Sequence, residues 1–455
     1  MITRHFIDVS SGGNSRRVHY RRMGKGPPLL MVHQSPRSSK EYEELMRKWS
    51  NHFTCIAPDT PGFGQSDPLP GEPEISDFGD AVITFLDALG IAQCAAYGFH
   101  SGGIILVTAV KRHPNRITSL AVGGYAIWSA AEMQLFSDRY LPAFHPSDYG
   151  EHLTWLWNRI LEQNWFFPWF AADNAHRLSL SNDDPARVDA VVRDMLDAGN
   201  AYQAGYGAVL RAPRDIPDRD AIVPPCLISA YDGDPLQEHI DRLQEMPPSW
   251  TAEKVATPGD HERVSLTHLL ATQTPMTNDF PKAPDEGFLP VQTDQFDGLI
   301  HWRGEQGASR LVLHPPAKAA LATPSQGHIA IDLPGHGLSD NWLDRIPDQW
   351  EAWEAVIASV AATLGTDETI YPTLPAGDPD RLYPDLSPDR FGVYLTTAWQ
   401  IVRARHMFDP WYMVNHDNAV AFEEQKLLPD HLAAEHLALI NGYSAKEYHT
   451  ALHTR

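Results

Sequence analysis

Residues 97–114 read YGFHSGGIILVTAVKRHP, and the organisation of the chain follows from this stretch. Its letters indicate the end of a strand, a glycine-rich turn and a buried helix. Gly98 and Gly102 lie two residues before and two residues after His100. Glycine at both places lets the backbone turn sharply enough to lift the side chain between them above a sheet. The stretch therefore predicts a strand, a sharp turn and a helix, with His100 at the tip of the turn.

Ser101 is the residue type usually found at the tip of such a turn, but it stands one position after the centre. If Ser101 were the centre, bulky Phe99 would occupy a place where the turn needs a small residue. The glycine spacing therefore favours His100. A reacting Ser101 would require a shifted turn, and it remains the second candidate.

Strand-like and helix-like segments alternate on both sides of this turn. Residues 5–9 and 17–21 alternate in polarity and predict an antiparallel hairpin. The run 28–33 has the continuous hydrophobicity of a strand that is buried on both faces. Residues 53–59 read as the next strand, and a helix-like stretch follows each of the two strands. This alternation predicts an α/β fold with a doubly wound, mostly parallel sheet.

Two further motifs resemble those of the α/β-hydrolase superfamily, and the resemblance covers roughly residues 18–124. HQSP, at 33–36, resembles the histidine-glycine stretch that supplies one oxyanion-hole amide, with Gln34 in place of the glycine. DTPGFGQSD, at 59–67, resembles the turn after the fourth strand of that family. The resemblance implies that His33 and Gln34 lie beside an oxyanion hole.

The turn itself also fits that family. In α/β-hydrolases a glycine pair follows the nucleophile, and an arginine-x-proline end closes the next helix. Gly102, Gly103, Arg112 and Pro114 fit this frame only if His100 is the elbow residue. The resemblance therefore implies a hydrolase core with a histidine at the nucleophile-elbow position.

The segment 128–215 is helical and aromatic in pattern, and we interpret it as a cap inserted after a first core part, 1–127. Trp128 and Trp165 are candidates to line an apolar substrate pocket between cap and core. The alternative is that the aromatic residues only pack the cap on the core, because aromatic side chains bury large areas wherever they lie.

The core resumes over 216–275, where Asp234 and His261 each follow a strand-like run. These places match those of the triad acid and the catalytic histidine in the hydrolases that the chain resembles. A carboxylate on the far nitrogen of an imidazole fixes its tautomer and stabilises the imidazolium. We therefore expect Asp234 to bind His261 in the catalytic site. The alternative is that both are ordinary surface-loop residues.

The remainder, 287–455, repeats parts of the beginning after a polar linker at about 276–286. Residues 299–316 parallel the first strands, 328–340 parallel the turn at 59–67, and 387–419 parallel part of the cap. A repeat this long predicts a duplication. Because this copy has no glycine-flanked elbow, we interpret it as a degenerate second hydrolase-like copy that covers the site or forms a contact in a homo-oligomer.

Composition limits the classes of partner. The 36 basic and 58 acidic residues give a net charge of −22, which disfavours nucleic acid and anionic membranes. A small apolar molecule is the expected substrate. The three cysteines fall in predicted strands, and no apolar run reaches the length of a membrane span of about 18 residues. We expect reduced cysteines and a cytoplasmic location.

Three interpretations of His100 stay open. In the first, His100 works with Asp234 and His261 as nucleophile, general base or hydrogen-bond donor. In the second, Ser101 is the nucleophile. In the third, the elbow is inactive and the chain only binds a ligand or assembles. A metal held by His33, His100 and His261 is chemically open, but the family's geometry disfavours it, so we expect no metal.

The predicted function is that of an α/β-hydrolase-fold enzyme acting without an organic cofactor on a small apolar carbonyl compound. An ester, a lactone or the C–C bond of a diketone would fit, with backbone amides near Gln34 and Ser101 holding the oxyanion. Cofactor-free lyase or oxygenase chemistry on the same fold is the second hypothesis. A catalytically silent ligand-binding or assembly protein is the third.

Overall fold

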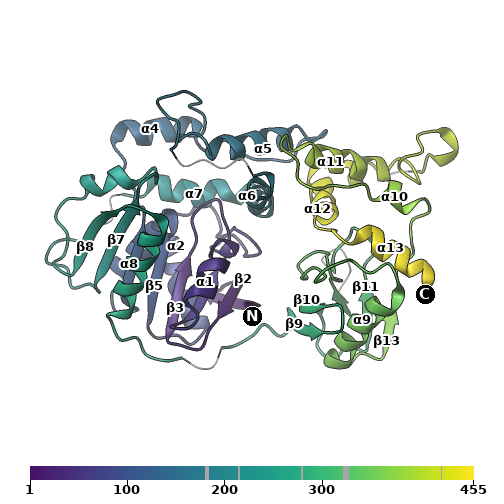
Figure 1. Ribbon diagram of the computed structural model, residues 1–455, viewed down its shortest axis with the longest axis horizontal. Helices are drawn as coiled ribbons and strands as arrows, with labels where there is room; N and C mark the ends of the chain where they lie inside the picture. The colour runs from purple at the N-terminus through teal and green to yellow at the C-terminus, as the bar shows by residue number, and fades with distance from the viewer. Residues whose placement is uncertain (180–183, 214–215, 278–279, 321–326, 422) are drawn as a thin grey trace. The chain divides into compact units, whose positions relative to one another are not determined.

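The computed structural model describes residues 1–179, 184–213, 216–277, 280–320, 327–421 and 423–455, drawn in Figure 1. Contacts between Cα atoms divide the chain into two compact units. The first unit is Met1–His145 with Asn158–Lys282, and the second is Pro146–Trp157 with Ala283–Arg455. The predicted cap therefore contributes a short segment to the second unit. Parts of the predicted cap and linker lie outside the described residues.

An eight-stranded sheet forms the core of the first unit, in the order β1-β2-β4-β3-β5-β6-β7-β8. β1 pairs antiparallel with β2 and β2 with β4, whereas the remaining neighbours pair in parallel. The predicted hairpin and doubly wound sheet are confirmed. The strands are β1 (Thr3–Ser11), β2 (Asn14–Met23), β3 (Pro28–Val32), β4 (Thr54–Pro58), β5 (Cys94–Phe99), β6 (Ile117–Gly123), β7 (Cys226–Tyr231) and β8 (Trp250–Val255).

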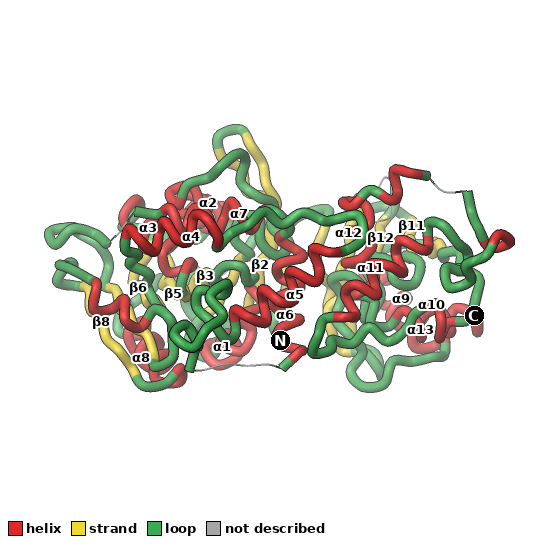
Figure 2. The backbone as a smooth tube through the Cα atoms, turned by 90° about the horizontal axis from the view of Figure 1, so that it is seen from above, coloured by secondary structure: helices red, strands yellow, loops and turns green. Residues whose placement is uncertain are grey.

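Helices cover both faces of this sheet. α2 (Ile75–Ala88) and α3 (Ser101–Arg112) bury their apolar sides in a core on one face. α1 (Glu43–Trp49) and α8 (Pro258–Leu270) contribute to a second core on the other face. Figure 2 shows α2 and α3 on one side of the strands and α1 and α8 on the other. Because helices cover both faces, every residue of β3 and β4 is buried.

The segment between β6 and β7 is helical, as the sequence predicts. Its helices are α4 (Ala130–Arg139), α5 (Glu151–Gln163), α6 (Pro185–Ala198) and α7 (Ala201–Arg211). The first turns of α5 belong to the second unit and its last turns to the first.

The second unit contains a five-stranded sheet in the order β13-β11-β12-β10-β9. Read from β9, this is the order β1-β2-β4-β3-β5 of the first sheet. Its strands are β9 (Glu286–Gln292), β10 (Asp297–Gly304), β11 (Arg310–Leu313), β12 (Ile329–Ile331) and β13 (Glu368–Ile370), and its helices are α9 (Trp350–Leu364), α10 (Pro379–Leu382), α11 (Val393–Arg405), α12 (Pro429–Ile440) and α13 (Ala445–Thr454).

Buried polar contacts also recur in the two units. Nδ1 of His19 lies 2.8 Å from Oδ2 of Asp59, and Nδ1 of His301 lies 2.8 Å from Oδ2 of Asp332. In each unit the other carboxylate oxygen accepts a backbone N–H from the segment after the third strand, at 2.7 and 2.6 Å. The sequence likeness of the two halves therefore extends to their internal hydrogen bonds.

No helix among the described residues is long and apolar enough to cross a membrane. Cys55, Cys94 and Cys226 lie buried in β4, β5 and β7 as free thiols. Burial raises the pKa of the Cys55 and Cys94 thiols to about 12. All three behave as small core residues and not as reactive groups.

Gly102→Ala should lower the free energy of unfolding of the first unit by about 2 kcal/mol or more, because overpacking against backbone is costly. A Cβ at this position would lie 1.9 Å from the carbonyl oxygen of Val32. Gly259→Ala in α8 is the control, since its nearest neighbour would be 3.8 Å away. Urea denaturation should show the loss for Gly102 and a change within about 0.5 kcal/mol for Gly259; equal effects would contradict the tight turn.

Candidate active site

The turn between β5 and α3 places His100 at its tip. His100 is the N-cap of α3, with a φ of 47° and a ψ of −113°, a conformation that residues with side chains rarely adopt. Its N–H donates to the carbonyl of Gly123 at 2.7 Å. A Cβ on Gly98 or Gly102 would come within 2.6 and 1.9 Å of backbone atoms. Only glycine fits on both sides of the turn, as the sequence spacing predicts.

The side chain of His100 faces Asp234, which follows β7. Nε2 of His100 lies 3.1 Å from Oδ1 and 3.2 Å from Oδ2 of Asp234. The Asp234 side chain is fully buried, whereas 21% of the His100 side chain is exposed. Burial alone would raise the pKa of Asp234, but His100 and the N–H of Leu236, which donates to Oδ1 at 2.8 Å, lower it. The carboxylate is therefore ionised.

This contact defines what the imidazole can do. A carboxylate that accepts from Nε2 fixes the proton on that nitrogen, which leaves the lone pair on Nδ1. The ring of Phe99 stacks on the imidazole, with 4.1 Å between centroids. The arrangement can accept a proton at Nδ1 and stabilise the resulting imidazolium through Asp234.

The prediction that Asp234 binds His261 is wrong. His261 lies buried in the first turn of α8, with its Nε2 2.9 Å from the hydroxyl of Tyr97 and its Nδ1 2.8 Å from Oγ of Ser229. Burial, opposed by the charge of Asp234, lowers the pKa of His261 to about 4. Because the carboxylate of Asp234 contacts His100, His261 remains neutral, and its two ring nitrogens bind Tyr97 of β5 and Ser229 of β7.

The hydroxyl of Ser101 is engaged by the loop after β3. Its Oγ accepts the backbone N–H of Ser35 at 2.6 Å, and only 4% of the residue is exposed. A reactive serine needs a general base beside its hydroxyl. The contact found here is an amide donor instead, so the geometry favours His100 over Ser101.

The same loop carries the predicted oxyanion residues. Nε2 of His33 accepts the N–H of Thr60 at 2.9 Å, and its Nδ1 lies 2.9 Å from the carbonyl oxygen of Gln34. His33 thus holds the loop after β3 in place through these two contacts. The N–H of Gln34 donates to Oε2 of Glu41 at 3.1 Å, so a carboxylate occupies the amide expected to bind an oxyanion. The sequence did not single out Glu41, which is one polar residue in an amphipathic stretch.

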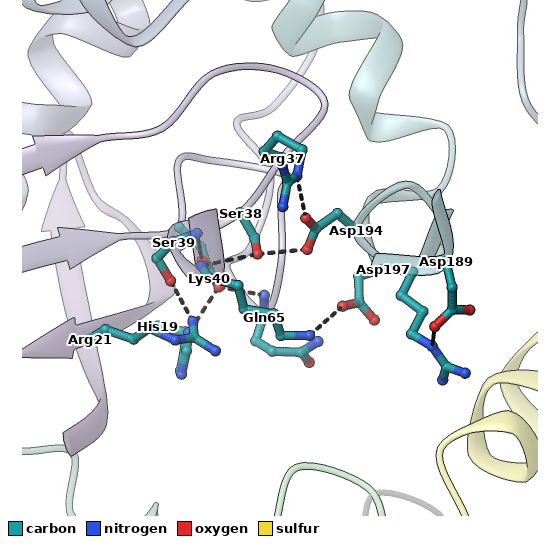
Figure 3. Close-up of polar contacts among 12 residues, drawn as sticks. His19, Arg21, Arg37, Ser38, Ser39, Lys40, Gln65, Asp189, Asp194 and Asp197 are labelled. Atoms are coloured by element: carbon teal, nitrogen blue, oxygen red, sulfur yellow. Dashed lines mark hydrogen bonds and ion pairs between the residues drawn. The ribbon is translucent and has the colours of Figure 1, made fainter. Parts of the chain in front are cut away.

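Cap helix α6 fixes the position of this loop. Nε of Arg37 donates to Oδ2 of Asp194 at 2.9 Å, and Oγ of Ser38 donates to Oδ1 at 2.7 Å. Only 1% of the Asp194 side chain is exposed. Figure 3 shows Arg37 and Ser38 reaching Asp194 from the loop. The backbone amides of the loop are therefore held by charge-assisted bonds to the cap.

Trp128, a predicted substrate-binding residue, follows β6 and contacts three rings. The centroid distances are 4.8 Å to Phe136, 4.9 Å to His239 and 6.3 Å to Phe167. Its indole N–H is buried and has no hydrogen-bond partner among the described residues. Since a buried donor normally has a partner, this N–H is a candidate donor to a ligand.

His239, which the sequence did not single out, packs edge-on against Trp128. Its Nδ1 accepts the N–H of Ile127 at 2.9 Å. Burial and Arg242 lower its pKa to about 4, against the opposing charges of Glu132 and Asp234. Trp165 lies after α5, and its carbonyl accepts the N–H of Leu178 at 2.9 Å. A role for Trp165 in the site stays a prediction.

Residues 27–236 match the family described as alpha/beta hydrolase fold. This part of the chain has the α/β-hydrolase fold. The match includes His100, Asp234 and the loop after β3.

Three curated relatives match shorter parts of the chain. The first is haloalkane dehalogenase 2 of Mycobacterium bovis, 27% identical over 162 residues, which are 35% of this chain and 52% of that protein. A second is the (E)-2-((N-methylformamido)methylene)succinate hydrolase of Acinetobacter baylyi, 30% identical over 110 residues (24% and 41%). A third is the cis-3-alkyl-4-alkyloxetan-2-one decarboxylase of Shewanella oneidensis, 32% identical over 127 residues (26% and 37%). The matches span about half of these relatives or less.

Outside the hydrolase fold, one group of potential metal ligands occurs among the described residues. His406, His431 and Glu435 of the second unit hold ligand atoms within 4.8 Å of one another. Nε2 of His406 lies 2.9 Å from Oε2 of Glu435, and Nζ of Lys318 binds Oε1. Against the effect of burial, His406 and Lys318 lower the pKa of Glu435 to about 2. The ammonium of Lys318 would compete with a metal ion for this carboxylate.

We expect the washed protein to contain neither zinc nor iron in stoichiometric amount, because Lys318 neutralises the carboxylate of Glu435 and both ring nitrogens of His33 and His261 already have partners. Elemental analysis tests this. One metal ion per chain would contradict it, and the same analysis of His406→Ala would then show whether the second unit holds the ion.

His261 should make the hydrolase fold sensitive to acid. The unfolded residue takes up a proton near its ordinary pKa of 6.5, but the folded residue does so only near 4. Stability is therefore lost as the pH falls from 6.5 towards 4. Between pH 7 and pH 5, His261→Gln should lose about 2 kcal/mol less unfolding free energy than the unsubstituted protein. Denaturation at both pH values measures this, with exposed His52→Gln as the control; equal acid losses would contradict the neutral, buried assignment.

Proposed function

We propose that the chain is an α/β-hydrolase-fold enzyme in which His100, oriented by Asp234, is a general base acting on a small apolar carbonyl compound without an organic cofactor. One observation carries the proposal. Nε2 of the elbow residue His100 lies 3.1 and 3.2 Å from the two oxygens of buried Asp234. The match of residues 27–236 to the alpha/beta hydrolase fold family supports it.

The proposed reaction begins with Nδ1 of His100 taking a proton from water. The hydroxide adds to the carbonyl carbon of an ester, lactone or diketone and gives a tetrahedral oxyanion. Collapse of this intermediate breaks the C–O or C–C bond, and the imidazolium returns its proton to the leaving group. Asp234 stabilises the imidazolium throughout, and general-base catalysis of this kind contributes about a hundredfold or more.

The oxyanion needs hydrogen-bond donors. The Gln34 amide is bound by Glu41, and the Ser35 amide is bound by Ser101. The buried indole N–H of Trp128, which lacks a partner among the described residues, is the donor that we propose instead. The aromatic rings around it are suited to an apolar substrate.

A second candidate reaction is cofactor-free lyase chemistry, which the Glu41 contact favours. If the Gln34 amide is unavailable, a tetrahedral oxyanion loses one of its usual donors. Removal of a proton from the carbon beside a carbonyl group still uses the same His100 base. Of the three relatives, one is named a hydrolase and one a decarboxylase, so both reaction classes occur in similar chains.

A catalytically silent protein is a weaker candidate. His100 adopts a φ of 47°, and such strain persists mainly where the surrounding structure and a function maintain it. The strained residue is also paired with an ionised carboxylate in a partly open position. A protein that only binds would have no use for this pair.

The proposal predicts opposite outcomes for two neighbouring residues. His100→Ala should lower kcat/KM about a hundredfold or more, because the general base is lost, whereas Ser101→Ala should keep most of the activity. A serine-directed fluorophosphonate should leave Ser101 unlabelled. Turnover of a panel of esters, lactones and diketones, with mass spectrometry of the treated protein, provides the measurements.

The converse result, a labelled Ser101 with a tolerant His100, would show an ordinary serine hydrolase with a shifted turn. If no compound in the panel is turned over by the unsubstituted protein, the silent binding protein is favoured instead. Asp234→Asn is the matched test of the pair, and it should cost nearly as much as His100→Ala because the tautomer is no longer fixed.

A further inference from the structure

Two tryptophans of the second unit make reciprocal hydrogen bonds. Nε1 of Trp157 donates to the carbonyl of Arg390 at 3.0 Å, and Nε1 of Trp399 donates to the carbonyl of Asp148 at 3.3 Å. The numbers 157 and 399 differ by 242, and so do 148 and 390. Residue 399 is therefore the counterpart of residue 157, and residue 390 is the counterpart of residue 148. Each tryptophan donates to the residue whose counterpart accepts the hydrogen bond of the other tryptophan.

Two glycines receive these rings in the same reciprocal way. A Cβ on Gly392 would lie 2.4 Å from the ring of Trp157, and a Cβ on Gly150 would lie 2.9 Å from the ring of Trp399. Both glycines have a positive φ, 67° and 87°, and their numbers again differ by 242. A side chain at either position would push the opposite tryptophan away.

The ring contacts follow the same rule. Trp157 packs edge-on against Tyr394, with 5.8 Å between centroids, and Trp399 packs edge-on against His152, with 4.8 Å. Residues 152 and 394 also differ by 242. Trp157 and Trp399 are 1% and 0% exposed, so the contact is well packed. Contacts in which residue i meets j and the copy of j meets the copy of i are the signature of a two-fold interface.

A neighbouring pair of tryptophans shows that this exchange is specific. Trp169 and Trp411 also differ by 242, but Nε1 of Trp169 donates to the carbonyl of Tyr140, and Nε1 of Trp411 donates to that of Leu382. Residues 140 and 382 are themselves 242 apart. These bonds stay inside each repeat, whereas those of Trp157 and Trp399 cross from one repeat to the other.

We propose that the segments 146–157 and 388–399 form a two-fold interface between two copies of one cap. Both copies lie in the same chain. The partner that this surface fits is its own copy. In a protein with a single copy it would join two subunits, whereas here the second repeat supplies the partner. The role of 388–399 is therefore recognition of 146–157, and it needs no catalytic residue. This inference does not rest on the proposed function.

A cut chain tests the interface. A protease site placed in the linker at 276–286 allows the folded full-length protein to be cleaved into two pieces. After cleavage the pieces should elute together with the mass of the whole chain, 50.8 kDa. Trp157→Ala and Trp399→Ala should each weaken the association about 30-fold or more, as expected of buried tryptophans at an interface, and by similar factors because the contact is symmetric.

Trp169→Ala and Trp411→Ala are the matched controls, and they should leave the association within about threefold, since their bonds stay inside each repeat. Thermal melts of the uncut variants identify any variant that fails to fold. For any such variant, Trp157→Phe and Trp399→Phe provide the test, because they keep a ring and lose the indole N–H. Each should weaken the association of the pieces less than the alanine variants do, and by equal factors. Separation of the unsubstituted pieces at micromolar concentration would overturn the proposal. So would a weakening of the association that differs more than about tenfold between Trp157→Ala and Trp399→Ala. Control variants that weaken the association as strongly as Trp157→Ala would also overturn it.

Discussion

The imidazole of His100 and the carboxylate of Asp234 meet because three backbone segments end at the same edge of the sheet. β5 ends in the sharp turn, β7 ends just before Asp234, and β6 ends at Gly123, whose carbonyl accepts the N–H of His100. Gly124 leaves room for the contact, because a Cβ there would lie 2.4 Å from the imidazole and 2.8 Å from the carboxylate. The rest of the site is arranged around this pair.

Once His100 takes the carboxylate, the other polar residues of the site need different partners. His261 binds Tyr97 and Ser229, and Ser101 accepts an amide of the loop after β3. A buried polar group without a partner is costly, so these contacts form together. Asp234 is thus paired with His100, and His261 is a neutral support bound to β5 and β7.

Glycine spacing and hydrophobic patterns were sufficient to predict the doubly wound sheet and the position of His100, because both depend on local backbone geometry. The partner of Asp234 could not be predicted, since two histidines compete for it and the outcome depends on side-chain geometry over long sequence separations. Glu41 was missed because a carboxylate in an amphipathic helix has no distinctive sequence signal. The helical pattern of this segment predicted a helix at α5. It did not predict that the first turns of α5 pack with α11, because the sequence around a buried tryptophan does not show which residues it contacts.

The protonation of His100 tests the central claim most directly, and it requires no substrate. Nitrogen-15 NMR of labelled imidazoles, assigned with His100→Ala, reports which ring nitrogen carries the proton. We expect a proton on Nε2 and a free lone pair on Nδ1 in the resting protein, with a changed signal in Asp234→Asn. A His100 that carries its proton on Nδ1, or whose signals do not respond to Asp234→Asn, would contradict it.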